Sequence, residues 1–177
     1  DDPSFSVIPG KHEFKAFPEG VPTQQIKYKG PRSVVVDTDR FLAFQIAALD
    51  WIVQQPVKPQ VIHCHDHHTG LIPFMMSQSK DYKTLQNIPS VLTIHNAQYQ
   101  GWFSHEKVYL IPEFDFLNVG LLDWNHTINP LAAGIKCAWK VTTVSPSYME
   151  ELKLNANGLE ALIRAESAKC IGVLNGI

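Results

Sequence analysis

The sequence contains no apolar run that approaches the roughly 20 residues needed to cross a bilayer. It also lacks the charged start and short apolar segment of a secretory signal. Lysine and arginine form no cluster, and the formal net charge is −2. Because nucleic-acid-binding domains usually concentrate basic residues on one face, we expect neither nucleic acid nor a membrane as a partner.

Cysteine is scarce, and Cys64, Cys137 and Cys170 are odd in number and far apart in the sequence. Two of the three lie among apolar residues, which favours reduced, buried thiols in a cytoplasmic protein. The chain begins Asp1-Asp2-Pro3 without a methionine, which indicates a fragment of a longer protein.

Several motifs of nucleotide and hydrolase chemistry are missing. The sequence holds neither Gly-x-Gly-x-x-Gly nor Gly-x-x-x-x-Gly-Lys-Ser/Thr. Ser145, His95 and Asp66 could form a triad on paper, but Ser145 does not lie in Gly-x-Ser-x-Gly. Because Pro146 follows it, Ser145 is instead predicted to cap a helix that has proline at its first position.

The length of 177 residues and the 45% hydrophobic content suit one α/β domain. Residues 1–36 are rich in proline and glycine and predict an irregular, poorly ordered segment with a short strand at 33–36. The domain itself is predicted to span residues 37–177. Its first helix is expected to begin at a cap within 37–39 and to carry Leu42, Ile46, Leu49 and Val53 on one face.

Strands and helices then alternate along the sequence. Because the strands read as mostly apolar, we expect a doubly wound, mainly parallel sheet with helices on both faces. Residues 102–128 form a long aromatic segment that is predicted to be irregular, and such loops are usually functional. The further strands are expected at 60–65, 90–95, 140–144 and 169–174, and the further helices at 69–77, 130–138, 146–152 and 158–165.

Polar residues follow four of the predicted strands. His65 and Asp66 end the first, His95 and Asn96 follow the second, Ser145 and Ser147 follow the third, and Asn175 follows the last. Ligands of open parallel sheets bind outside the carboxyl ends of the strands. We therefore expect these side chains to gather at one edge of the sheet and to form the binding site.

The run His63-Cys64-His65-Asp66-His67-His68 raises the question of a metal site, because histidine and aspartate are common zinc ligands. Neighbouring residues of a strand point to opposite faces, however, and no second ligand cluster occurs elsewhere. We expect no bound metal and no cofactor. His63 is interpreted as a core histidine, whereas His65, Asp66 and His68 are the better site candidates.

Five segments of the chain together resemble the bacterial glycogen and starch synthases. The first two are Ile62-His63-Cys64-His65-Asp66-His67-His68-Thr69-Gly70-Leu71 and Leu92-Thr93-Ile94-His95-Asn96-Ala97-Gln98-Tyr99-Gln100-Gly101. The others are Asn129-Pro130-Leu131-Ala132-Ala133-Gly134-Ile135, Val144-Ser145-Pro146-Ser147-Tyr148 and Gly172-Val173-Leu174-Asn175-Gly176-Ile177. Their order and spacing are similar to the family pattern over residues 40–177.

The resemblance implies a retaining glucosyltransferase built from two Rossmann-like domains, of which this chain is most of the first. Such an enzyme passes glucose from ADP-glucose or UDP-glucose to the non-reducing end of an α-1,4-glucan. By resemblance, His95 and Asp66 are the catalytic residues, Asn96 and Asn175 contact the donor sugar, and His65 and Tyr99 support the site. The family's Lys-x-Gly-Gly-Leu loop and its second domain are absent, so the chain alone is expected to be inactive.

Two other functions remain open at this point. One is a glucan- or nucleotide-binding module without turnover, and the other is a metallohydrolase that uses the histidine cluster at 63–68.

Overall fold

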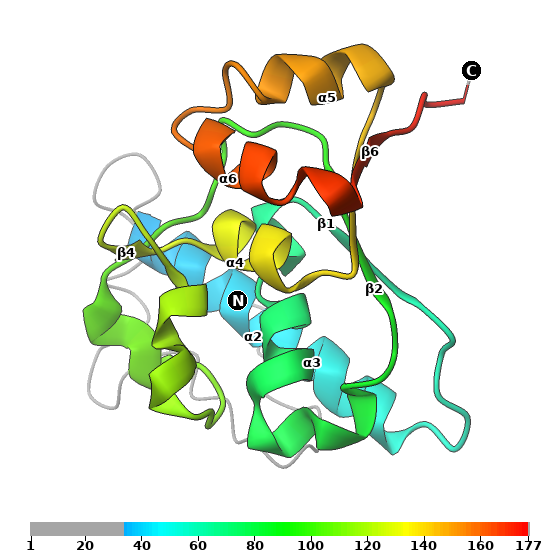
Figure 1. The fold of residues 1–177 in the computed structure, drawn as a ribbon. Coiled ribbons are helices and arrows are strands. Elements are labelled where there is room, and N and C mark those ends of the chain that lie inside the picture. Colours follow the sequence, from blue (N-terminus) through cyan, green and yellow to red (C-terminus); the bar gives the residue numbers. More distant parts are fainter. Residues whose placement is uncertain (1–33, 177) are drawn as a thin grey trace.

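The computed structural model describes residues 34–176 (Figure 1). Residues 1–33, which the sequence predicts to be irregular, lie outside the described part of the chain. The larger helices are α2 (Val34–Gln54), α3 (Ile72–Gln78), α4 (Pro130–Cys137), α5 (Pro146–Leu152) and α6 (Glu160–Ala165). The strands are β1 (Ile62–His65), β2 (Ser90–Ile94), β3 (Asp123–Trp124), β4 (Thr127–Ile128), β5 (Lys140–Thr143) and β6 (Cys170–Gly172).

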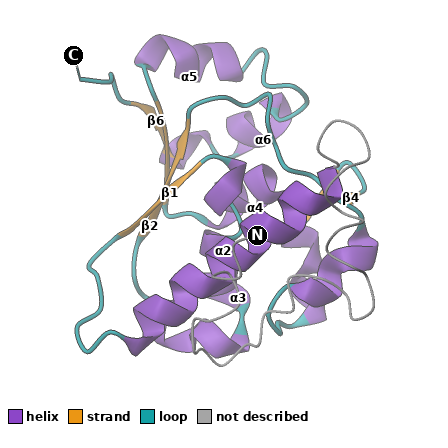
Figure 2. Ribbon diagram, turned by 180° about the vertical axis from the view of Figure 1, so that it is seen from behind, coloured by secondary structure: helices purple, strands orange, loops and turns teal. Residues whose placement is uncertain are grey.

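Four strands form a parallel sheet in the order β1-β2-β5-β6. Cys64 of β1 lies opposite Leu92 of β2, which in turn lies opposite Val141 of β5. The strands are connected through helices, and the chain is of the α/β class with a parallel sheet, as predicted. In the described part of the chain the helices lie to one side of this sheet, and α5 lies past the strand ends (Figure 2).

The one-sided covering makes the edge strand β1 alternate between buried and exposed residues. Along β1, Ile62 and Cys64 are buried, and the alternate residues His63 and His65 are exposed. The interpretation of His63 as a core histidine is therefore wrong. Its ring lies on the uncovered face, where Nε2 is 2.7 Å from Thr93 Oγ1.

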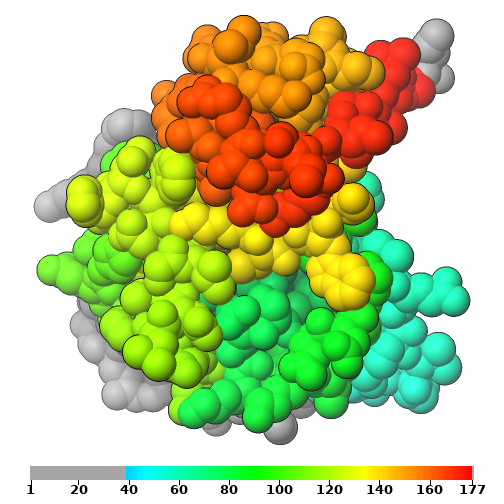
Figure 3. All heavy atoms as spheres, in the orientation of Figure 1, coloured from blue at the N-terminus to red at the C-terminus, as the bar shows by residue number. Residues whose placement is uncertain are grey.

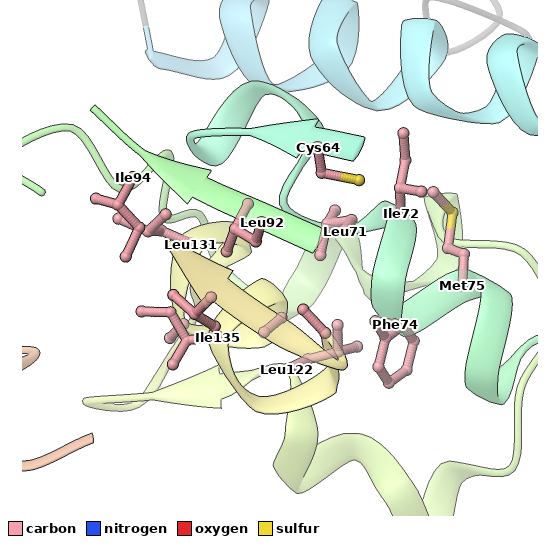
Figure 4. Close-up of a cluster of buried hydrophobic side chains, with 14 of the residues drawn as sticks. Cys64, Leu71, Ile72, Phe74, Met75, Leu92, Ile94, Leu122, Leu131 and Ile135 are labelled. Atoms are coloured by element: carbon pink, nitrogen blue, oxygen red, sulfur yellow. The ribbon is translucent and has the colours of Figure 1, made fainter. Parts of the chain in front are cut away.

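The core lies between the covered face of the sheet and helices α3 and α4 (Figure 4). Leu92 and Ile94 of β2 are fully buried, and so are Phe74 of α3 and Leu131 of α4. Burying a large apolar side chain contributes about 1.5–3 kcal/mol, so this cluster is the main source of stability.

Helix α2 begins earlier than predicted. Residues Val34–Val36, expected as a strand, are its first turn, so the predicted cap at residues 37–39 lies inside the helix. Valine favours strands, but its cost in a helix is only a fraction of a kcal/mol, and a helix that has already formed extends cheaply. The predicted apolar stripe is confirmed, since Leu42, Ile46 and Leu49 are buried.

Residues 102–128 contain more local structure than predicted. They form two short 3₁₀ helices, η4 (His105–Leu110) and η5 (Phe116–Leu121), and the small antiparallel pair β3-β4. The hydroxyl of Ser104 and the carboxylate of Asp115 cap the two 3₁₀ helices. Side-chain caps of this kind stabilise single turns that hydrophobic periodicity does not predict.

The three cysteines are free thiols. Cys64 is buried, whereas Cys137 and Cys170 are partly buried. Burial raises the pKa of Cys64 to about 12 and that of Cys137 to about 11, so both are protonated at neutral pH. Within residues 34–176 no helix is long and apolar enough to cross a membrane.

Candidate functional site at the carboxyl edge of the sheet

Asp66 joins the carboxyl ends of β1 and β2. Its Oδ1 accepts hydrogen bonds from the backbone N–H of His95 at 2.8 Å and of Asn96 at 3.3 Å. Its own N–H donates to the carbonyl of Thr93, and its φ of 52° lies in the left-handed region. Backbone strain of this kind persists where the surroundings fix it, often at ligand sites. The geometry therefore holds Asp66, His95 and Asn96 together at one edge, as the sequence predicts.

Three imidazole rings lie next to one another on the uncovered face beside this edge. The ring centroids of His63 and His65 are 4.3 Å apart, and those of His65 and His95 are 5.3 Å apart. His65 Nδ1 lies 3.0 Å from His95 Nε2, so one of these nitrogens donates a hydrogen bond and the other accepts it. This hydrogen bond orients the His95 ring and couples the tautomers of the two imidazoles, because one ring must donate and the other accept.

The surroundings of His65 disfavour its charged form. Its pKa is lowered below the ordinary value of 6.5, first by burial and then by His63 and His95, although Asp66 acts in the opposite direction. As the pH falls through 6.5, the unfolded chain therefore protonates His65 before the folded chain does. This difference favours the unfolded chain, so the His65 ring lowers the stability of the fold over that pH range. Above that pH its ring is neutral in both states.

We predict that His95→Gln raises the pKa of His65, since the substitution removes one of the positive charges that oppose protonation. The measurement is an NMR titration of the assigned His65 ring protons between pH 4 and 8. His126→Asn, in the turn between β3 and β4, removes an exposed imidazole elsewhere and is the matched control. An unchanged His65 titration in His95→Gln would contradict the proposed coupling.

Asn175 lies at the same edge but farther along it. Its N–H donates to the carbonyl of Val144, which follows β5. Asn175 itself follows β6, and β6 is two strands from β2, which carries His95 at its end. Residues 173–176 project from the surface beside α5 (Figure 3). Ser145 is the helix cap that the sequence predicts, because its Oγ accepts a hydrogen bond from Tyr148 N–H at 3.0 Å.

A cavity of about 610 Å³ opens beside the edge, and we call it the aromatic cavity. Tyr99 and Trp102, which as whole residues are 63% and 56% exposed, line it, and Phe41 of α2 forms another part of the wall. His67 and His68 also line it, and the His68 ring packs edge-on against Phe41 at 4.5 Å between centroids. The remaining lining residues are Arg40, Leu42, Gln45, Leu71, Gln98, Gln100, Gly101, Phe103 and Pro130.

Sequence reasoning did not find Phe41 or Gln100 as site residues. Gln100 is only 7% exposed, and its amide donates to the carbonyls of Ala97 and Asn157 while accepting from Asn129. It therefore ties the turn after β2 to the loop before α6. The one signal in the sequence was its place six residues after a buried strand, which is shared by many ordinary loop residues.

The histidine run at 63–68 does not form a metal site in the described chain. Cys64 is buried on the covered face, whereas His63 and His65 lie on the opposite, exposed face. Within residues 34–176 no group of three or more histidine, cysteine, aspartate or glutamate side chains is arranged to hold a metal ion.

A parallel sheet with carboxylate, imidazole and amide groups at its carboxyl edge, beside an aromatic cavity, defines a Rossmann-like α/β domain with its candidate ligand site at the strand ends. The chain belongs to the starch synthase catalytic domain family, whose pattern it matches over residues 16–165. This is a family of glycosyltransferases, and nothing in the comparisons supports the metallohydrolase alternative.

Two bacterial glycogen synthases illustrate the relationship. The chain is 54% identical to that of Flavobacterium johnsoniae over 141 residues, which cover 80% of this chain and 30% of the relative. It is 39% identical to that of Streptococcus sanguinis over 146 residues, covering 80% and 31%. The chain thus spans about a third of the length of these enzymes.

A solved starch synthase structure has a similar fold. The catalytic domain of starch synthase IV from Arabidopsis thaliana, bound to ADP and acarbose, superposes with a TM-score of 0.70 at 30% identity. The match covers 94% of this chain and 34% of the Arabidopsis chain.

Proposed function

We propose that this chain supplies the first of two Rossmann-like domains of a retaining glucosyltransferase. The complete enzyme transfers glucose from a sugar nucleotide to the non-reducing end of an α-1,4-glucan. Residues 37–177 are the part that belongs to this domain, and the groups that bind the donor phosphates belong to the second. The glycogen synthases of Flavobacterium and Streptococcus, which are about three times as long as the matched region, support this proposal.

The observation that carries the proposal is the arrangement of Asp66, His95 and Asn96. Asp66 Oδ1 accepts two backbone N–H groups, which leaves Oδ2 to accept a hydroxyl of the transferred glucose. His95 and Asn96 are exposed at the same edge, and imidazole and amide groups both donate to and accept from hydroxyls. We assign the catalytic roles to His95 and Asp66, and donor-sugar contacts to Asn96 and Asn175.

The physical demand of the reaction fits these groups. Glycosyl transfer develops positive charge on the anomeric carbon, and a nearby carboxylate with oriented dipoles stabilises that charge. The hydrogen bond between His65 and His95 orients the His95 ring before substrate arrives, which reduces the reorganisation needed during the reaction.

The donor we propose is ADP-glucose, because the Arabidopsis neighbour is bound to ADP, and UDP-glucose is the alternative to be compared in the same assay. The reaction takes place in the cytoplasm in our proposal, since three free thiols suit a reducing compartment.

The aromatic cavity is the proposed path of the acceptor glucan. Tyr99 and Trp102 present exposed ring faces, and Gln98 lies next to them with its amide exposed. Sugar rings pack their C–H faces on aromatic rings while amides bind their hydroxyls, so this lining suits a glucan. The acarbose in the Arabidopsis structure supports a carbohydrate ligand for this fold.

The test is a chimaera in which residues 16–177, from the start of the family match and with helix α2 whole, replace the corresponding segment of the Flavobacterium glycogen synthase. We predict that the chimaera incorporates labelled glucose from ADP-glucose into glycogen, whereas the 177-residue chain alone does not. The isolated chain fails because near-attack positioning of both reactants supplies many kcal/mol of the barrier reduction and needs both domains. Turnover by the isolated chain, or a folded but inactive chimaera, would overturn the proposal.

A further inference from the structure

Polar side chains from three strands are joined by hydrogen bonds on the uncovered face of the sheet. Thr142 of β5 lies opposite Thr93 of β2, and their Oγ1 atoms are 2.6 Å apart. Thr93 Oγ1 is also 2.7 Å from Nε2 of His63 in β1. Thr142, Thr93 and His63 therefore form one hydrogen-bonded unit, which we call the polar row.

The polar row ends against the histidine that contacts His95. The rings of His63 and His65 are 4.3 Å apart between centroids and are tilted by 32°. His65 Nδ1 in turn lies 3.0 Å from His95 Nε2. The polar row is thus connected to the His95 ring by one ring contact and one hydrogen bond.

The Thr93 hydroxyl can anchor the His63 ring in either of its tautomers. A hydroxyl has one donor and two acceptor sites. When His63 Nε2 carries a proton, it donates to Thr93 Oγ1. When it carries none, Thr93 donates to it and accepts from Thr142 instead. Because Thr93 is only 9% exposed, water competes little for these hydrogen bonds.

Packing alone does not explain the two threonines. Strands inside parallel sheets are usually rich in valine, isoleucine and leucine, and a buried hydroxyl is costly unless it is hydrogen-bonded. Valine has the shape of threonine and also favours strands. Valine at positions 93 and 142 would therefore fill the same space without that cost. What the hydroxyls add is a fixed direction for the His63 ring.

His63 also influences the charge of His65. Burial is the largest cause of the lowered pKa of His65, and His63 is the next, ahead of His95, whereas Asp66 acts in the opposite direction. A protonated imidazole can only donate, whereas a neutral ring has one donor and one acceptor nitrogen. A neutral His65 can therefore accept a hydrogen bond from His95 as well as donate one.

We propose that His63, anchored by Thr93 and Thr142, is a positioning residue that holds His65 in the orientation from which it orients the His95 ring. The ring contact restricts His65, and the hydrogen bond between His65 and His95 transmits this restriction. The polar row acts through His65 and not by touching the substrate. The inference rests on the proposed function, because that proposal assigns the catalytic role to His95.

Two substitutions of Thr93 separate positioning from packing. Thr93→Val keeps the shape of the side chain and removes the hydroxyl, whereas Thr93→Ser keeps the hydroxyl and removes a methyl group. In the chimaera we expect Thr93→Val to lower kcat about tenfold with KM unchanged, and Thr93→Ser to stay within about threefold of the parent. A packing role predicts the reverse order, because only serine leaves a space unfilled, and that order would overturn the proposal.

His63→Ala tests whether the Thr93 hydroxyl acts through His63. We expect this variant to lower kcat about tenfold or more, and Thr93→Val to cause no further loss when it is added, since no ring is left to anchor. Losses that multiply in the double variant would contradict the proposal. Lys140→Gln is the control, because Lys140 is exposed and lies on the same side of β5 as Thr142, with buried Val141 between them.

An NMR measurement on the 177-residue chain tests the positioning without any activity. At about pH 8, well above the ordinary histidine pKa of about 6.5, a fixed tautomer gives two separate ring ¹⁵N signals, and exchanging tautomers give averaged ones. We expect separate signals for His65 and His95 in the parent chain and in Thr93→Ser. In Thr93→Val and His63→Ala the signals should move toward the average.

The outcomes distinguish this proposal from the proposed function. Unchanged ring signals of His65 and His95 in folded His63→Ala, or an unchanged kcat in Thr93→Val, would overturn the positioning role and leave the proposed function standing. An inactive chimaera whose isolated chain shows the expected ring signals would count against the proposed function and support the positioning of His95. Circular dichroism verifies that each variant is folded.

Discussion

His95→Ala is expected to lower kcat about 100-fold or more in the chimaeric glycogen synthase, with little change in KM for glycogen. The reason is that we assign His95 a catalytic role at the carboxyl edge, where Asp66 accepts a hydrogen bond from its backbone N–H and its ring is hydrogen bonded to His65. Removing one oriented group that stabilises a transition state typically costs 10²–10³ in kcat, about 3–4 kcal/mol. In our proposal the acceptor glucan occupies the aromatic cavity, which His95 does not line, so we expect glucan binding to be spared.

The measurement is initial-rate kinetics with labelled ADP-glucose at varied glycogen concentrations. His126→Asn is the control, since it removes an imidazole from a turn outside the aromatic cavity, and asparagine tolerates the φ of 63° found there. A His95→Ala chimaera with near-normal kcat would remove His95 from the reaction. A large rise in KM with unchanged kcat would instead assign His95 to acceptor binding.

The edge of the sheet was predictable from the sequence because parallel strands bring their carboxyl ends together whatever their order. Asp66 and His95 follow short apolar strands, and this placement alone predicts that they meet. Their register was not predictable, nor was the order that puts Asn175 two strands from His95, because strand order depends on long-range packing.

The error on His63 has a physical cause that extends to the whole sheet. The prediction assumed helices on both faces, which would bury successive residues of each strand. In the described chain the helices cover one face, so β1 alternates and His63 is exposed. Isoleucine, histidine and cysteine in β1 are compatible with both arrangements, and only the position of the helices decides between them.

The aromatic cavity was beyond sequence reasoning for a different reason. Phe41 comes from α2, and Trp102 comes from the segment after the turn that follows β2. Each is an ordinary surface residue of its own element, and only the packing of these elements around the turn after β2 brings them together.

Gly70→Ala is expected to destabilise the fold by about 3 kcal/mol. Gly70 has an ordinary backbone conformation, so the argument concerns space alone. A Cβ at this position would lie 2.3 Å from the carbonyl oxygen of Pro130, the first residue of α4. Gly134, one turn farther along α4, faces the same segment, and its Cβ would lie 2.8 Å from the Gly70 carbonyl oxygen. The backbones of the segment after Asp66 and of α4 are therefore in direct contact.

A backbone carbonyl cannot rotate away as a flexible side chain can, so α4 must move outward to admit the methyl group. Overpacking typically costs 1–3 kcal/mol, and we expect the upper end because Leu131 of α4 is fully buried beside the contact. For a chain of this size that loss lowers Tm by about 6–12 °C. Gly120→Ala is the matched control, since a Cβ there meets no atom within 4 Å. Thermal unfolding followed by circular dichroism measures both variants, and equal Tm values for the two would show that the contact between Gly70 and α4 can relax at no cost.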